Sequence, residues 1–141
     1  MHVVTDIYDV HTYEQDYEKF AEIFAPMVLG GEPFEPFPEQ QKYGGEPYFV
    51  SEYGGFRWNP DSMEGWGYGD APKTVDEFVL RYTKMAETLL ENPNIFALCY
   101  TQLYDVEQEV NGLYYYNRVP KFDDNIMDEL KNAMLKKAAI E

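Results

Sequence analysis

The chain is poor in basic residues: 11 Lys and Arg stand against 26 Asp and Glu, for a formal net charge of −15. Such an excess of negative charge repels a phosphate backbone and an anionic lipid surface. We therefore expect no nucleic-acid partner and no binding to an acidic membrane. The same charge is no obstacle to a neutral sugar.

Cysteine and long apolar runs are also scarce. Cys99 is the single cysteine, which excludes a disulfide within the chain, and its apolar neighbours predict a core position. No stretch approaches the roughly 20 apolar residues of a membrane span. The first residues show neither the basic region nor the apolar core of a secretion signal. We expect a soluble chain, and the sequence leaves its compartment open.

What the chain does contain is enough apolar material for one domain. Its 141 residues are 45% apolar and 17% aromatic, with 13 tyrosines. Tyrosine combines a flat apolar ring with a polar tip, so this excess indicates either ring-lined sugar sites or protein interfaces.

Three apolar segments read as strands, and each is followed by apolar residues at helical spacing. The strands are expected at Val3–Val10, Tyr48–Ser51 and Ile95–Tyr100, and the helices at 17–24, 75–90 and 123–134. Pro26 should end the first helix, and Thr74 with Glu77 forms a capping box for the second. This alternation predicts the α/β class, with parallel strands and right-handed crossovers.

Glu52 directly follows the second expected strand and precedes Gly54 and Gly55. A carboxylate at the carboxyl end of a parallel strand lies where barrel enzymes place their active sites, and glycines allow close approach of a ligand or backbone. The alternative is a structural carboxylate paired with Arg57.

Three motifs carry a resemblance to a known family. They are Asp6–Tyr13 (DIYDVHTY), Ser51–Gly55 (SEYGG) and Cys99–Leu113 (CYTQLYDVEQEVNGL). In this order and spacing they resemble glycoside hydrolase family 2, which includes β-galactosidases and β-glucuronidases. The resemblance implies a partial (β/α)8 TIM barrel, with residues 1–141 forming its C-terminal portion: strands six to eight and their helices.

The same resemblance implies a retaining β-glycosidase that works by double displacement, with Glu52 as the nucleophile. The family's acid/base glutamate follows an asparagine on the fourth strand, and no Asn-Glu pair occurs in this sequence. Three strand–helix units cannot close an eight-stranded barrel. We therefore expect a β-galactosidase-like fragment that is inactive alone.

Further residues are assigned to the sugar site by the resemblance. His11 would hydrogen-bond a hydroxyl and Tyr13 would shape the subsite, while the alternative for His11 is a rim histidine paired with carboxylates such as Asp9. Tyr100 would be a platform under the sugar or part of the core, and Gln102 follows it closely. Trp66, between two glycines, would stack on a sugar or plug its own loop.

No cofactor and no metal are expected, since double displacement at a sugar needs neither. Asp105, Glu107 and Glu109 could suggest a calcium loop, but the turn glycine of a known site is missing, and a solvated acidic loop is the favoured interpretation.

Two other classes of function stay open. One is a carbohydrate-binding module without hydrolysis. The other is a self-associating scaffold, because an incomplete barrel exposes strand edges that invite pairing. We expect either a homo-oligomer that buries the edge strand at Val3–Val10 or pairing with the missing N-terminal part of the barrel.

Overall fold

The computed structural model describes residues 4–141, which form three strands alternating with three helices. The elements in chain order are β1 (Tyr8–Thr12), α1 (Tyr17–Val28), β2 (Tyr48–Gly54), α2 (Val75–Leu90), β3 (Ile95–Thr101) and α3 (Asp124–Met134). The strands pair in parallel in the order β1-β2-β3. The predicted α/β alternation and the parallel sheet are confirmed.

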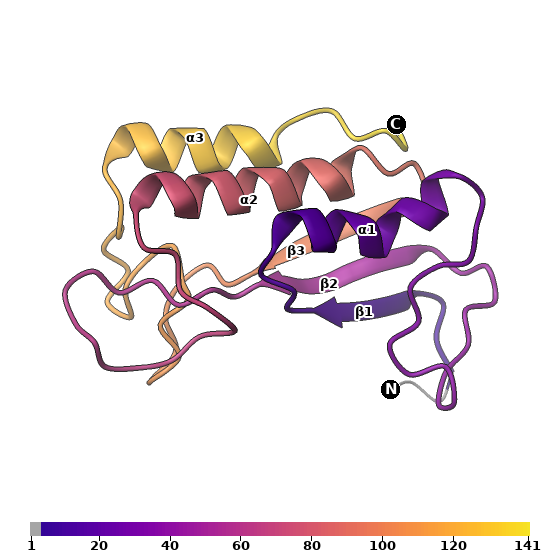
Figure 1. Ribbon diagram of the computed structural model, residues 1–141, viewed down its shortest axis with the longest axis horizontal. Helices are drawn as coiled ribbons and strands as arrows, with labels where there is room; N and C mark the ends of the chain where they lie inside the picture. The colour runs from indigo at the N-terminus through magenta and orange to yellow at the C-terminus, as the bar shows by residue number, and fades with distance from the viewer. Residues whose placement is uncertain (1–3) are drawn as a thin grey trace.

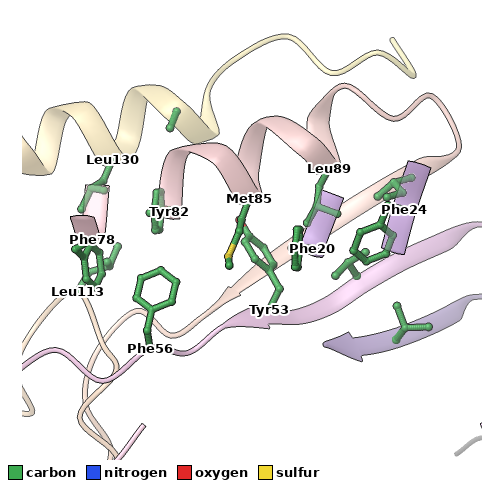
Figure 2. Close-up of a cluster of buried hydrophobic side chains, with 14 of the residues drawn as sticks. Phe20, Phe24, Tyr53, Phe56, Phe78, Tyr82, Met85, Leu89, Leu113 and Leu130 are labelled. Carbon is green, nitrogen blue, oxygen red and sulfur yellow. The ribbon is translucent and has the colours of Figure 1, made fainter. Parts of the chain in front are cut away.

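All three helices lie on the same face of the sheet, with α2 between α1 and α3 (Figure 1). The core fills the space between this helical layer and the strands (Figure 2). Its largest fully buried side chains are aromatic, contributed by the helices, by β2 and by the segment after β2: Tyr48, Tyr53, Phe20, Phe24, Phe56 and Phe78. Rings of this size account for much of the apolar area that the fold removes from water.

The opposite face of the sheet is not covered by any helix of residues 4–141 (Figure 1). Along β1, Tyr8 and Val10 are buried toward the helices, so Asp9 and His11 point to the other side. On β3, Cys99 is exposed, and the prediction of a core position for it is wrong. The apolar run around Cys99 indicates a strand made for burial on both faces, but here only one face is covered.

The first strand was expected at Val3–Val10 and is found at Tyr8–Thr12; Val3 lies outside the described residues. Pairing begins only where β2 begins, because Tyr8 donates its N–H to the Pro47 carbonyl at 3.0 Å. Just before Tyr8, the Thr5 hydroxyl makes a local turn with the backbone of Ile7. The strand therefore starts later than the sequence predicts and extends further.

The first helix continues past Pro26 to Val28, contrary to the prediction. The extra turn buries Met27 in the core. Asn92 donates to the Phe24 carbonyl at 3.1 Å, and Asn94 donates to the Met27 carbonyl at 2.7 Å. These bonds satisfy carbonyls in the last turn of α1, where a helix leaves acceptors free.

The other helix starts agree with the sequence. Thr74 accepts a hydrogen bond from the Glu77 N–H at the start of α2, and Asp123 accepts one from Ile126 at the start of α3. These side chains satisfy backbone donors that a helix leaves free at its first turn. Within residues 4–141, no helix combines the length and the apolar character that crossing a membrane requires.

Candidate functional site

A β-bulge places Glu52 on the open face of the sheet. Val10 pairs with Val50, but the next residue of β1, His11, pairs with Glu52, so Ser51 is an extra residue in β2. Both Ser51 and Glu52 are half-buried, between the buried Val50 and Tyr53. A bulge of this kind redirects a side chain. Here it brings Glu52 beside His11 near the carboxyl ends of the strands.

Two side chains from the β1 end of the sheet meet the Glu52 carboxylate. The Tyr13 hydroxyl donates a hydrogen bond to Glu52 Oε2, and His11 Nδ1 lies 3.4 Å from the same oxygen. Glu52 keeps 40% of its side chain exposed, so it remains open to a ligand. Burial, and then the hydrogen bond to Glu52, raises the pKa of Tyr13 well above its ordinary value, which keeps this hydroxyl a donor.

Asp9 supports the same corner of the open face. Ser51 Oγ donates to Asp9 Oδ2 at 3.0 Å, and His11 Nε2 lies 3.9 Å from that oxygen. His11 is thus flanked by two carboxylates, as the rim alternative predicts, and it also lies beside Glu52, as the site interpretation requires.

Arg57 is not the partner of Glu52. Its guanidinium donates to the carbonyls of Ser62 (2.6 Å), Glu64 (3.1 Å) and Gly65 (3.3 Å) in the loop after β2. Within residues 4–141, the basic side chain beside the Glu52 carboxylate is His11, at 3.4 Å. The interpretation of Glu52 as a carboxylate held by Arg57 is therefore wrong.

The two glycines after Glu52 make room for aromatic rings. A Cβ at Gly54 would lie 2.3 Å from Tyr100, and one at Gly55 would lie 2.7 Å from Tyr68 and 3.0 Å from Tyr13. Both glycines have positive φ, 81° and 65°. The sequence predicted a close approach at this point, and side chains of the chain itself provide it.

Two of the predicted site residues, Tyr100 and Gln102, make their contacts away from the Glu52 carboxylate. The Tyr100 ring packs against Tyr53 and Tyr82 in the layer between sheet and helices, which is the core alternative for this residue. Its hydroxyl is buried and has no hydrogen-bond partner within residues 4–141. Gln102 donates to the Asn111 side chain at 2.7 Å.

Trp66 is 48% exposed and lies in the loop after β2. Its ring meets Tyr68 edge-on, and Tyr68 in turn stacks on Tyr13. Trp66 is therefore linked to the site through Tyr68 while keeping an exposed surface. Its backbone pairs with the loop after β3, through hydrogen bonds to Gln108 and from Val110, each 2.8 Å long.

Lys121 ties these two loops together. Its side chain has no exposed surface, and Nζ donates to Asp105 Oδ1 at 2.7 Å and to the carbonyls of Trp58 (2.6 Å) and Val110 (3.2 Å). Burial lowers the pKa of Lys121, and the charge of Asp105 opposes that shift. The prediction of a solvated acidic loop is thus wrong for Asp105, which is buried in an ion pair.

Sequence reasoning did not identify Tyr68, Gln15 or Lys121 as residues of this region. Gln15 Nε2 donates to the carbonyls of Tyr13 (3.0 Å) and Gly54 (2.7 Å), which joins the ends of β1 and β2. Tyr68 could have been suspected from the glycine–aromatic alternation at 65–69. Nothing in the local sequence marks Gln15 or Lys121, because the partners through which they join separate segments, Gly54 and Trp58, are distant in the chain.

Replacing Gly55 by Ala should destabilise the chain by clearly more than Gly30→Ala. Both glycines have similar positive φ (65° and 74°), so both substitutions strain the backbone, by roughly 1–2 kcal/mol. Only Gly55 would also displace Tyr13 and Tyr68, since nothing lies within 4 Å of a Cβ at Gly30. Urea unfolding measures both free energies. Equal losses would contradict the packing described here.

Two solved structures similar to this one come from Bacteroides uniformis. One is a β-glucuronidase, with a TM-score of 0.60 and 19% identity over 92% of this chain. Another is β-glucuronidase 2 covalently bound to cyclophellitol-6-carboxylate aziridine, with a TM-score of 0.57 and 16% identity over 93% of this chain. This chain spans 15% of the length of each of them. No protein-family profile and no curated protein matches it. The three strand–helix units thus share the fold of a part of these enzymes.

Proposed function

We propose that this chain is the nucleophile-bearing part of a retaining β-glycosidase of the family 2 type, a three-unit portion of a TIM barrel. The observation that carries the proposal is the Glu52 carboxylate, open to solvent on the uncovered face of the sheet and hydrogen-bonded by Tyr13. The shared fold with two β-glucuronidases supports it, as does the matching order of the three sequence motifs.

In the proposed reaction, Glu52 attacks the anomeric carbon as the glycosidic C–O bond breaks, and the leaving oxygen takes a proton from the acid/base carboxyl group and departs as an alcohol. Water, deprotonated by the same group, then hydrolyses the covalent glycosyl-enzyme and releases Glu52. The Tyr13 hydroxyl holds the carboxylate oxygen in place for the attack. His11, half-exposed beside it, is placed to hydrogen-bond a sugar hydroxyl, and the exposed ring of Trp66 offers a stacking surface. We assign Tyr100 and Gln102 a structural role rather than contact with the sugar. The Tyr100 ring packs against Tyr53, and the Gln102 side chain donates to Asn111.

Double displacement needs a second carboxyl group, about 5–5.5 Å from the nucleophile, as acid and base. We assign that group to another part of the parent barrel, and we therefore expect little turnover of ordinary glycosides by this chain alone.

We infer that the part of the sugar site formed by residues 4–141 suits a neutral sugar. A uronate carboxylate would need a free cation near Glu52. Arg57 is committed to three carbonyls of its own loop, and Lys121 is buried against Asp105. The substrate class thus differs in this proposal from that named by the two similar structures.

Glu52 should become labelled by a 2-fluoro glycosyl fluoride, because fluoride leaves without strong acid assistance. We expect an added mass on the intact wild-type chain with galactosyl, glucosyl or mannosyl reagents rather than the glucuronyl one. Glu52→Gln should abolish the adduct, and Glu64→Gln, which alters an exposed carboxylate of the following loop, should keep it. An adduct that persists in Glu52→Gln would contradict the assignment, and no adduct with any sugar would show that this chain alone does not form a competent site.

The outer edges of β1 and β3 favour a second role, in which the sheet pairs either with another copy of this chain or with the remaining strands of a barrel. β1 and β3 each pair on one side only within residues 4–141, and Phe96 on β3 is 41% exposed. Free edges of this kind pair readily with another strand. We expect light scattering to find a dimer or larger species of the isolated chain, and a well-folded monomer would contradict this role.

A further inference from the structure

Tyr13 is held on its outer side by another tyrosine. Its ring stacks on that of Tyr68 with centroids 3.5 Å apart and an angle of 10° between the planes. Trp66 then meets Tyr68 edge-on, with centroids 5.6 Å apart at 83°. The three rings form a row that runs from the hydroxyl on Glu52 to the exposed surface of the loop after β2.

Tyr68 is itself fixed relative to the strand that carries Glu52. Its backbone N–H donates to the Gly55 carbonyl at 2.8 Å, and its ring fills the space where Gly55 lacks a side chain. Gly55 lies three residues after Glu52. The contacts with Gly55 therefore fix the position of Tyr68 relative to the strand end that carries the Glu52 carboxylate.

Tyr13, by contrast, lies beyond the last residue of β1 and has no sheet pairing. Gln15 fixes its carbonyl, but that bond does not fix the ring. The side chain of Tyr13 turns about two bonds. Rotation about Cα–Cβ would carry the hydroxyl away from Glu52, whereas rotation about Cβ–Cγ turns the ring plane and leaves the phenol oxygen in place. The side chain therefore needs a neighbour that restricts it.

We propose that Tyr68 is a positioning residue that holds the Tyr13 hydroxyl on Glu52 through the stacked rings. The effect of this positioning on catalysis rests on the proposed function of Glu52. The positioning of Tyr13 by Tyr68 does not depend on it. Offset or edge-on aromatic pairs shift an equilibrium by roughly two- to twelvefold. The Tyr13–Tyr68 pair, with centroids 3.5 Å apart and nearly parallel planes, is close to face-to-face, so we expect an effect at the low end of that range. The stacked ring of Tyr68 carries the main part of the effect, and a side-chain hydrogen bond between Tyr68 and Tyr13 adds to it. Phe should therefore preserve most of the effect, and an aliphatic residue should not.

The test follows the Tyr13 hydroxyl proton by NMR on the folded chain, and so does not depend on activity. A hydroxyl bonded to a carboxylate and half-buried should give a downfield, slowly exchanging resonance, assigned by its loss in Tyr13→Phe. We expect Tyr68→Phe to keep this resonance and Tyr68→Leu to broaden or abolish it. Tyr116→Leu, which removes an exposed tyrosine of the other loop, should leave it unchanged.

An unchanged hydroxyl resonance in a folded Tyr68→Leu chain would overturn the proposal. Should that variant not fold, the wild-type chain still decides: ring protons of Tyr13 must be shifted upfield by the stacked Tyr68, and unshifted protons would overturn it equally. Where the 2-fluoro sugar labels Glu52, Tyr68→Leu should slow labelling by roughly twofold or more, and Tyr68→Phe should slow it less. Absent labelling in the wild type would count against the proposed function alone, because the NMR result stands without it.

Discussion

The structure depends on a sheet that is buried on one face only. α1, α2 and α3 cover the same side, and the rings of Phe20, Tyr53 and Phe78 fill the space beneath them. Burial of this apolar area supplies the main driving force for folding. Because the helices occupy one side, every second strand residue is directed to the other, where Asp9, His11 and Glu52 meet solvent and one another. The same constraint stabilises the fold and exposes the candidate site.

The candidate site is built around the Glu52 carboxylate. A β-bulge in β2 determines where this side chain points, and the tyrosine that bonds it is packed against a second aromatic ring. The bulge at Ser51 turns Glu52 toward His11. Tyr13, the residue directly after β1, donates its hydroxyl to the same carboxylate. Glycine at position 55 then permits an aromatic pair to pack against the strand end. Further out, Lys121 is paired with Asp105 inside the loop after β3 and donates to the Trp58 carbonyl in the loop after β2, which joins the two loops. Removing either partner of such a pair would leave an uncompensated buried charge, which is far costlier than the loss of a surface ion pair.

Much of the fold could be predicted because helices and strands depend largely on the spacing of apolar residues and on capping side chains within each segment. Helical periodicity identified α2, and the side chains of Thr74 and Asp123 marked the helix starts. Predictions failed where residues distant in the chain take part. β1 begins where Pro47 offers a carbonyl, and the end of α1 beyond Pro26 is held by hydrogen bonds from Asn92 and Asn94. The motif pointed to Glu52, but the bulge and Tyr68 follow from strand register and loop packing. The apolar run that led us to place Cys99 in a core fits a strand made for burial on both faces, and the described residues cover one.

Cys99 therefore offers the most direct test of the central claim, that one face of the sheet is open in this chain. It is the single cysteine, so its reaction with a thiol reagent reports on β3 alone. The account predicts that the folded chain reacts at a rate comparable to that of the chain unfolded in urea. A thiol that is strongly protected until the chain unfolds would place Cys99 in a closed core and contradict the open face on which Glu52, His11 and Tyr13 are assembled.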